Sequence, residues 1–268
     1  MEVNLLVFGA EINTYDEFIK AFYPKSGLDL KFYKQNQMER RIRSFMTSHG
    51  YPSFTTFLQS LDRDKALFDA FFKHLTINVT QFFRDANQWT SLKELILPKL
   101  IHGTNPLKLW SAGCSSGQEA YSMAITMNEH FPHTRFSILA SDIDVNVLEQ
   151  AKKGIYKQPD FVSTPPELLA KYFTPLNEGF QIKDNIKRAV TFQKQNLLTD
   201  RFDTQFDLIA CRNVVIYFTE EAKEMLYTKF AASLRPGGVL FTGSTEHLFG
   251  LNHLGLKPVS SFFYQKEV

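Results

Sequence analysis

Four polar residues stand where the sequence predicts that buried strands end: Glu119, Asp142, Asn196 and Arg212. In open α/β sheets, ligands bind beyond the carboxyl ends of the strands, so side chains at these positions share one crevice. Asp142 follows the apolar run 135–141 and stands 25 residues after Gly117, close to where nucleoside-binding folds place an acid for the ribose hydroxyls. Alone, Asp142 is equally well explained as a solvated turn residue beside Asp144, but the four residues together predict a nucleoside site.

A turn of small residues precedes Glu119. The stretch 107–121, LKLWSAGCSSGQEAY, predicts a buried strand, a turn and a helix, which is the opening unit of a nucleotide-type α/β fold. Gly113 and Gly117 are four residues apart, unlike G-x-G-x-x-G, so the turn alone is equally compatible with an ordinary strand-to-helix connection. It has no G-K-[ST] and few basic residues, which suits a nucleoside cofactor without phosphates, and S-adenosylmethionine fits that description.

Strands and helices alternate from residue 107 onward. Strands are predicted at 107–110, 135–141, 190–192, 206–211 and 239–242, and helices at 119–131, 145–153 and 220–234. This alternation predicts an α/β fold with a mostly parallel, helix-covered sheet and a last, antiparallel strand at 260–265. The proline-rich segment 155–189 interrupts the alternation, and we expect it to be an insertion with small antiparallel strands.

The N-terminal part of the chain has a helical pattern instead. Residues 1–90 carry apolar side chains at helical spacing and predict an all-helical domain. A helical linker is expected at 91–106, followed by the domain 107–268, with 155–189 inserted in it.

A helix is expected near 29–48, with a buried stripe that contains Met38. Arg40 and Arg43 fall nearly opposite this stripe, and Arg41 lies on its flank. Such a run is either a solvated helix face or a docking face for an acidic protein partner. In the second case the positive charges of the run would attract and orient the partner.

Polar residues also occur inside an apolar run near residue 80. Asn78, Thr80 and Arg84 stand among apolar neighbours that include Phe82 and Phe83, and a polar side chain in such a setting needs a partner. Asn78 or Thr80 can serve simply as a helix cap. Arg84 is different, because a guanidinium beside two phenylalanines requires an anion or an aromatic face.

Composition excludes several classes of protein. The net charge of +2 argues against a dominant nucleic-acid partner. Cys114 and Cys211 lie 97 residues apart, and the sequence has no histidine cluster, so we expect neither a disulfide framework nor a metal site. We expect the protein to occupy a reducing compartment. The sequence shows no signal peptide and no apolar run of membrane-spanning length, so a cytoplasmic protein without direct membrane insertion is expected.

Five segments together resemble the CheR-type chemotaxis receptor methyltransferases. They are WSAGCSSGQEAYS (110–122), ASDID (140–144), IACRNVVIYF (209–218), LRPGGVLF (234–241) and TINVTQFFR (76–84). The resemblance covers most of the chain and is specific, because C-R-N-x-x-I-Y-F and N-x-T-x-F-F-R are not expected together by chance. The departures are Gln118, where the family has an acid, and Ala120, where it has proline.

The resemblance implies a Rossmann-like S-adenosylmethionine-dependent methyltransferase domain with a small antiparallel β insertion, preceded by an all-helical N-terminal domain. It implies methyl esterification of glutamate side chains on the cytoplasmic helical domain of chemoreceptors, with S-adenosylhomocysteine as the product and no metal. Carried over by motif, the residues that line the cofactor pocket are Asn78, Thr80, Arg84, Glu119, Asp142, Asn196, Leu197, Cys211 and Arg212.

The same resemblance places Arg84 and Tyr217 nearest the methyl group and assigns receptor docking to Arg40, Arg41 and Arg43. Tyr217 is otherwise explained as a core aromatic beside Phe218. Cys211 is expected to be a small packing residue rather than a nucleophile, since no histidine is near it in sequence. The alternative function is a cofactor-binding regulatory module of a signalling pathway without turnover.

Overall fold

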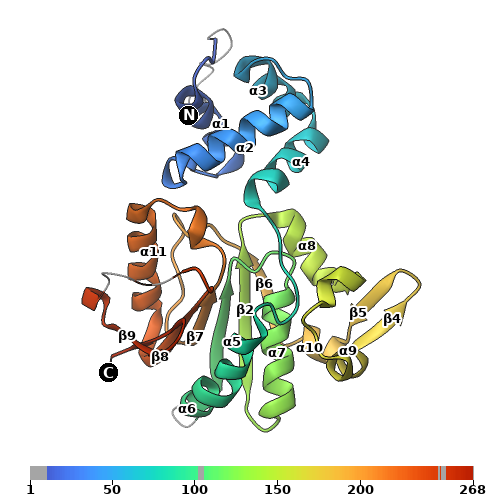
Figure 1. The fold of residues 1–268 in the computed structure, drawn as a ribbon, viewed down its shortest axis with the longest axis vertical. Helices are drawn as coiled ribbons and strands as arrows, with labels where there is room; N and C mark the ends of the chain where they lie inside the picture. The colour runs from blue at the N-terminus through green and yellow to red at the C-terminus, as the bar shows by residue number, and fades with distance from the viewer. Residues whose placement is uncertain (1–10, 102–105, 247, 249–251, 268) are drawn as a thin grey trace, which may run out of the picture. The chain divides into compact units, whose positions relative to one another are not determined.

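The computed structural model describes residues 11–101, 106–246, 248 and 252–267, and the chain divides into two compact units, Met1–Ile77 and Asn78–Val268. The regular elements of the first unit are α1 (Tyr15–Ser26), η1 (Leu30–Phe32), α2 (Gln35–Ser48), α3 (Phe54–Arg63) and α4 (Lys65–Thr76) (Figure 1). All of them are helical, so the prediction of an all-helical N-terminal domain is confirmed over this range.

Phenylalanine rings form the core of the first unit. Phe18 of α1, Phe57 of α3 and Phe71 of α4 are fully buried, and the rings of Phe57 and Phe71 meet edge to face with centroids 4.8 Å apart. From α2, the predicted stripe beginning at Met38 is buried against them. The basic residues of α2 therefore occupy the remaining, polar side of that helix.

The second unit is organised around a seven-stranded sheet with the order β6-β2-β1-β7-β8-β10-β9. Its strands are β1 (Leu107–Ala112), β2 (Phe136–Asp142), β6 (Val190–Lys194), β7 (Phe206–Cys211), β8 (Leu234–Thr242), β9 (Leu256–Ser260) and β10 (Phe263–Lys266). The first five run parallel to one another, and β10 and β9 are added antiparallel. Their parallel pairing confirms the predicted sheet and brings the carboxyl ends of β1, β2 and β7 to one edge.

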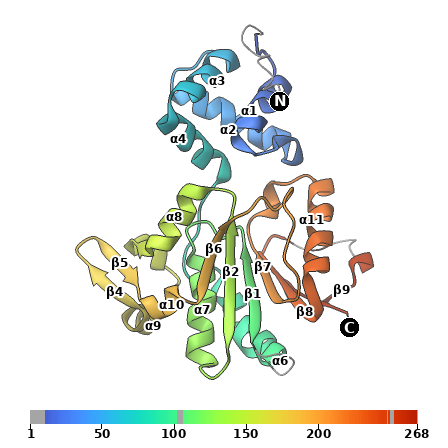
Figure 2. The ribbon, with the colours of Figure 1, turned by 180° about the vertical axis from the view of Figure 1, so that it is seen from behind.

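Helices cover this sheet. α7 (Gln118–His130) packs on β1, β2 and β6, and it lies in front of the strands in Figure 1 and behind them in Figure 2. α8 (Val145–Lys153) packs on β2 and β6, and α11 (Glu220–Ser233) packs on β8. Every residue from Ala120 to Met127 of α7 is buried, which explains why the segment lacks a clear polar face in sequence.

The boundary between the units differs from the expected one near residue 90. It falls between Ile77 and Asn78, and α5 (Ala86–Ser91), the π-helical η2 (Leu92–Ile96) and α6 (Leu97–Ile101) belong to the second unit. The physical reason is that Phe82, Phe83 and Trp89 are buried in the same apolar core as the strands. Apolar helical spacing alone could not show which core these side chains join.

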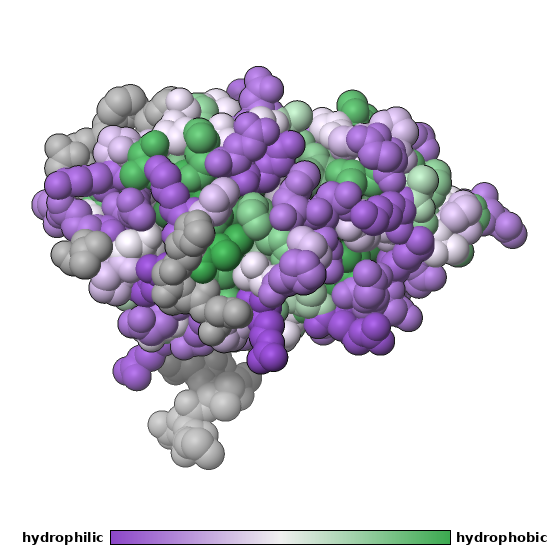
Figure 3. Space-filling model, turned by 90° about the horizontal axis from the view of Figure 1, so that it is seen from below, coloured by the Kyte–Doolittle hydropathy of each residue, from purple (hydrophilic) through white to green (hydrophobic). Residues whose placement is uncertain are grey.

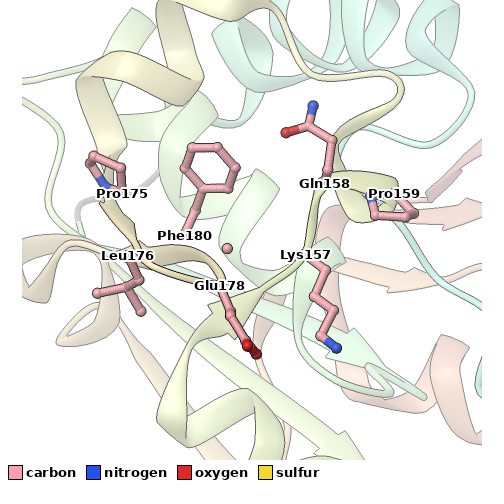
Figure 4. A pocket seen from close by; sticks show the side chains of 8 residues that line it. Lys157, Gln158, Pro159, Pro175, Leu176, Glu178 and Phe180 are labelled. Atoms are coloured by element: carbon pink, nitrogen blue, oxygen red, sulfur yellow. The ribbon is translucent and has the colours of Figure 1, made fainter.

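The inserted segment forms a second, three-stranded antiparallel sheet with the order β3-β5-β4, as predicted. Its elements are β3 (Ile155–Tyr156), η3 (Gln158–Phe161), α9 (Pro166–Tyr172), β4 (Phe173–Leu176), β5 (Gly179–Ile182) and α10 (Asp184–Lys187). A cavity of about 500 Å³ lies between η3 and the β4–β5 hairpin, where Phe180 stands between Pro175 and Gln158 (Figure 4). None of the predicted site residues lines this cavity.

The surface seen from below in Figure 3 is mainly hydrophilic, with hydrophobic side chains in small separate areas. Among the described residues, no helix is both long enough and apolar enough to cross a membrane.

Candidate functional site

The turn after β1 is held by close backbone contacts. Gly113 N and Cys114 N both donate to the carbonyl oxygen of Ser141, at 2.8 and 2.9 Å, which ties the turn to the end of β2. Gly113 has a φ of 81°, and a Cβ on it would lie 2.5 Å from Cγ2 of Val214 in the loop after β7. A residue with a side chain would be strained at this φ and would clash with Val214, so position 113 requires glycine. Through these contacts the turn connects the ends of β1, β2 and β7.

A buried guanidinium connects this region to the segment before α5. Arg212, 6% exposed, donates from Nη1 to Glu119 Oε2 at 3.4 Å and from Nη2 to Asp85 Oδ2 at 3.0 Å. Nη2 also donates to the Arg84 carbonyl oxygen at 2.9 Å and to Gln88 Oε1 at 2.7 Å. Arg212 thereby fixes three chain segments to one another, and its donors are used within the protein.

Glu119 is a mostly buried acceptor at the start of α7, with 12% of its side chain exposed. Its Oε1 accepts a hydrogen bond from Ser111 Oγ at 2.8 Å, while Oε2 faces Arg212. Burial raises the pKa of Glu119, and the positive charges of Arg212 and Arg84 oppose that shift. The Arg84 carbonyl oxygen and Glu119 Oε2 both accept from the Arg212 guanidinium, which bridges the two residues.

Asp142 is a second buried carboxylate, at the end of β2. Its Oδ2 accepts from Ser115 N at 2.8 Å and its Oδ1 from Asp144 N at 3.0 Å. Burial raises the pKa of Asp142 to about 6, against the lowering effect of these backbone donors. Burial raises the pKa of the neighbouring Cys114 thiol, and the negative charges of Asp142 and Glu119 raise it further.

Asn78 reaches the same edge of the sheet by another contact. Its Nδ2 donates to Asp144 Oδ2 at 2.9 Å, and Asp144 Oδ1 accepts from Asn146 N at 2.9 Å at the start of α8. Thr80, two residues further on, is half-buried. These contacts place the segment that begins at Asn78 beside the end of β2.

Asn196 and Leu197 follow β6 directly. Gln195 N donates to the Asp142 carbonyl oxygen at 2.9 Å, so the chain passes Asp142 immediately before these two residues. Asn196 is half-buried and its Oδ1 accepts from Leu198 N at 3.0 Å, whereas Leu197 is buried. Both therefore lie at the edge of the sheet where the sequence predicted them.

The two remaining predicted residues lie at and after the end of β7. Cys211 is fully buried, and burial raises the pKa of its thiol well above the usual range, which agrees with a packing role. Tyr217 lies in η4 (Val215–Tyr217) and is half-buried. Within the described part of the chain, its hydroxyl makes no hydrogen bond.

Arg84 contributes to the site through both backbone and side chain. Its Nη1 donates to the Val79 carbonyl oxygen at 3.2 Å, and its own carbonyl oxygen accepts from Trp89 Nε1 at 2.9 Å as well as from Arg212. The guanidinium has five N–H donors, so most of them are left for a ligand.

Four residues that hold the site together were not predicted: Asp85, Gln88, Lys229 and Glu246. Lys229 Nζ donates to the carbonyl oxygens of Leu197 at 2.8 Å and Asp200 at 2.7 Å, and so holds the loop after β6. Among these four residues, only Asp85 could have been suspected from the sequence, because it follows Arg84 directly. Gln88 is 124 residues from its partner Arg212, and no local pattern reveals such a contact.

The three predicted docking arginines differ in their surroundings within the first unit. Arg40 and Arg43 are exposed, and Arg43 Nη2 lies 2.7 Å from Glu39 Oε1 one helical turn earlier. Arg41 is half-buried, and its guanidinium donates to the His74 carbonyl oxygen near the end of α4. Arg41 therefore holds two helices together, which leaves Arg40 and Arg43 as the exposed cations of this run.

The donor set suits a cationic nucleoside such as S-adenosylmethionine. Asp142 is buried and the side chain of Glu119 is mostly buried, and their carboxylate oxygens can accept further hydrogen bonds from an ammonium or from ribose hydroxyls. The Ser115 hydroxyl is buried beside them without a partner among the described residues. Across the same residues, no group of three or more His, Cys, Asp or Glu side chains is arranged to hold a metal ion.

Comparison with known proteins gives a consistent result. The family described as "CheR methyltransferase, SAM binding domain" matches residues 78–260, and "CheR methyltransferase, all-alpha domain" matches 13–76. A protein from Listeria monocytogenes named "Chemotaxis protein methyltransferase" is 40% identical over 90% of this chain and 92% of its own length. One of the same name from Borreliella burgdorferi is 35% identical over 95% of this chain and 96% of its own length.

A solved structure of a putative S-adenosyl-L-methionine-dependent methyltransferase from Methanococcus maripaludis is 16% identical, with a TM-score of 0.34, over 59% of this chain and 62% of that one. The two family domains meet at residues 76 and 78, where the structure divides the chain, and together they cover nearly all of it. With its S-adenosylmethionine-binding domain and its all-helical N-terminal domain, this chain belongs to the CheR methyltransferase family.

Proposed function

We propose that this protein transfers the methyl group of S-adenosylmethionine to glutamate side-chain carboxylates of chemoreceptors, forming methyl esters in sensory adaptation. The observation that carries the proposal is the group of Glu119, Asp142 and Arg212 at the carboxyl ends of parallel strands, inside a domain of this family. Relatives named for chemotaxis support a chemoreceptor as the substrate. The protein would then act in the cytoplasm, on the cytoplasmic helical domain of the receptor.

The reaction needs little proton chemistry from the protein. When bound, S-adenosylmethionine supplies a methyl group on a positively charged sulfur. A glutamate carboxylate, with a reference pKa of about 4.3, is already ionised at neutral pH and needs no general base. The protein has to remove water from that carboxylate and hold it in line with the methyl carbon, which is catalysis by positioning.

Arg84 and Tyr217 are the residues that we assign to this positioning. A guanidinium holds a carboxylate through paired, charge-assisted hydrogen bonds, and Arg84 has donors left after its bond to Val79. The Tyr217 hydroxyl, without a partner among the described residues, supplies a second, directional donor.

The cofactor pocket that we propose consists of Asn78, Thr80, Arg84, Glu119, Asp142, Asn196, Leu197, Cys211 and Arg212. Asp142 is assigned to the ribose hydroxyls, as an acceptor at the end of β2. Arg212 acts through Glu119, since its own donors already bind Glu119, Asp85, Gln88 and a backbone carbonyl.

Docking of the receptor is assigned to the exposed cations of α2. Arg40 and Arg43 present positive charge on the polar side of a helix whose other side is buried. Such charges steer an acidic helical partner and lose effect as salt is added. Arg41, which binds the end of α4, supports this surface rather than forming it.

The decisive experiment is transfer of tritiated methyl groups to a receptor cytoplasmic fragment, with base-labile esters mapped by mass spectrometry. We expect labelled glutamates in the fragment and none when those glutamates are replaced by alanine. The rival function, a regulatory module without turnover, predicts that S-adenosylhomocysteine binds in calorimetry while no label is transferred. Binding without transfer under conditions that keep the fragment folded would therefore refute the proposal.

A further inference from the structure

Glu246 is a buried carboxylate that belongs to none of the predicted motifs. It is 4% exposed and lies in the segment that follows β8. Within the described residues it forms no ion pair, and three backbone N–H groups bind its two oxygens instead. Oε2 accepts from Asn213 N at 2.7 Å and Gly243 N at 2.8 Å, and Oε1 accepts from Val215 N at 3.0 Å.

Two of these donors belong to the loop that leads from Arg212 to Tyr217. Asn213 has a φ of 59°, in the left-handed region, and Val215 begins η4, which ends at Tyr217. A non-glycine residue in that region needs support from its surroundings, and the bond from Asn213 N to Glu246 supplies it. The carboxylate therefore fixes the backbone on both sides of Val214, three residues before Tyr217.

The approach of Glu246 to this loop requires a glycine at position 243. A Cβ on Gly243 would lie 2.6 Å from Glu246 Oε2 and 2.9 Å from Asn213 N. The loop is confined on its other side as well, because Val214 fills the space beside Gly113. Contacts on two sides thus give the segment 213–217 one position relative to the turn after β1.

Burial of a carboxylate is costly unless hydrogen bonds compensate it, and here backbone N–H groups supply them. Burial raises the pKa of Glu246, and the N–H groups of Asn213, Gly243 and Val215 act against that shift. Nearly full burial and the inward direction of both oxygens exclude Glu246 from contact with a receptor glutamate. Its effect on the reaction has to pass through the loop that it binds.

We propose that Glu246 is a positioning residue for methyl transfer: by holding the N–H groups of Asn213 and Val215, it sets the place of the Tyr217 hydroxyl. The inference rests on the proposed function, since it takes Tyr217 as the residue that orients the receptor carboxylate. It predicts that loss of the Glu246 carboxylate lowers kcat far more than the affinity for the cofactor product.

The test uses the full-length variant Glu246→Gln, which keeps the size of the side chain but turns an amide N–H₂ toward backbone donors. We expect kcat with a receptor fragment to fall about tenfold or more, with the Kd for S-adenosylhomocysteine changed less than about threefold. Glu221→Gln, an exposed charge-matched control on α11, should leave both values unchanged. Equal losses in kcat and in affinity would overturn the proposal.

A double-mutant cycle with Tyr217→Phe separates positioning from a general loss of structure. If Glu246 acts through Tyr217, then Glu246→Gln costs little more in kcat once the hydroxyl is gone. Additive losses would show that Glu246 acts elsewhere.

Gly243→Ala is a second variant, which displaces the carboxylate without removing it. It should reproduce the loss of kcat, and it keeps the test valid if Glu246→Gln does not fold.

Hydrogen exchange provides a readout that does not depend on methyl transfer. Peptides covering 212–218 should exchange faster in Glu246→Gln than in the wild type, because glutamine keeps only one of the two side-chain oxygens, so either Asn213 N or Val215 N loses its acceptor. If the wild type transfers no methyl group but this difference is present, the proposed function fails while the positioning contact stands. If exchange is unchanged, the positioning role itself is refuted.

Discussion

Arg212 Nη1 lies 3.4 Å from Glu119 Oε2, and this ion pair between the residue after β7 and the first turn of α7 is mostly buried, with side-chain exposures of 2% and 12%. The same guanidinium binds Asp85 and Gln88, so this one positive charge holds together residues that lie far apart in the chain. Removal of Arg212 leaves the Glu119 carboxylate without this ion pair, which is the costly case for buried ion pairs.

Replacement of Arg212 by methionine should therefore lower the free energy of unfolding of the second unit by about 3 kcal/mol. Urea unfolding followed by tryptophan fluorescence measures this unit alone, since Trp89 and Trp110 both belong to it. Lys152→Met, which removes an exposed charge on α8, should change the value by less than about 1 kcal/mol. Equal stability of Arg212→Met and wild type would contradict the structural role assigned to the network.

Tyr217→Phe should slow methyl transfer about tenfold or more while the cofactor product still binds with unchanged affinity. The reason is that only the hydroxyl is lost, and the ring keeps its place in η4. Single-turnover rates with a receptor fragment and calorimetry with S-adenosylhomocysteine measure the two effects separately. A collapse of binding affinity would instead identify Tyr217 as part of the cofactor pocket.

Binding of S-adenosylhomocysteine should weaken as the pH falls, because Asp142 has a pKa of about 6 in the folded protein. Burial raises this pKa above its unfolded value, so protonation of Asp142 favours the folded state, and that contribution is lost as pH rises through about 6. If only the ionised carboxylate binds ribose, affinity falls about tenfold between about pH 7 and about pH 5.

Calorimetry across this pH range gives the check, with Asp142→Asn as the matched variant. Its affinity should be low and should keep only the pH dependence that belongs to Glu119, whose pKa is also raised by burial. A wild-type affinity that does not change over the range would argue against a direct bond from Asp142 to the ligand.

Charge reversal of both Arg40 and Arg43 to glutamate should raise KM for the receptor fragment at low salt, with little change in kcat. The expected rise is about tenfold or more at low ionic strength and much smaller at high salt, because the attraction is screened. Lys65→Glu with Lys73→Glu is a matched control, since these residues are exposed on α4. If both double variants behave alike, net charge rather than the α2 surface governs binding.

The strands at the centre of the sheet were predictable because continuous apolar runs bounded by glycine, proline and polar residues identify buried strands. The position of Asp142 at the end of a strand was predictable because it follows such a run directly. The domain boundary was not, since Phe82 and Trp89 have the same helical spacing whichever core they enter. Glu246 was missed because its partners are backbone N–H groups, which no sequence pattern distinguishes.

The boundary between Ile77 and Asn78 separates the residues that we assign to receptor recognition from those that we assign to methyl transfer. Every residue assigned to the cofactor and to methyl transfer lies after this point, and the exposed arginines assigned to the receptor lie before it. A different helical unit joined at Asn78 would bring a new target to the same catalyst. Under these assignments, receptor recognition and methyl transfer can evolve independently, through one recombination event at this boundary.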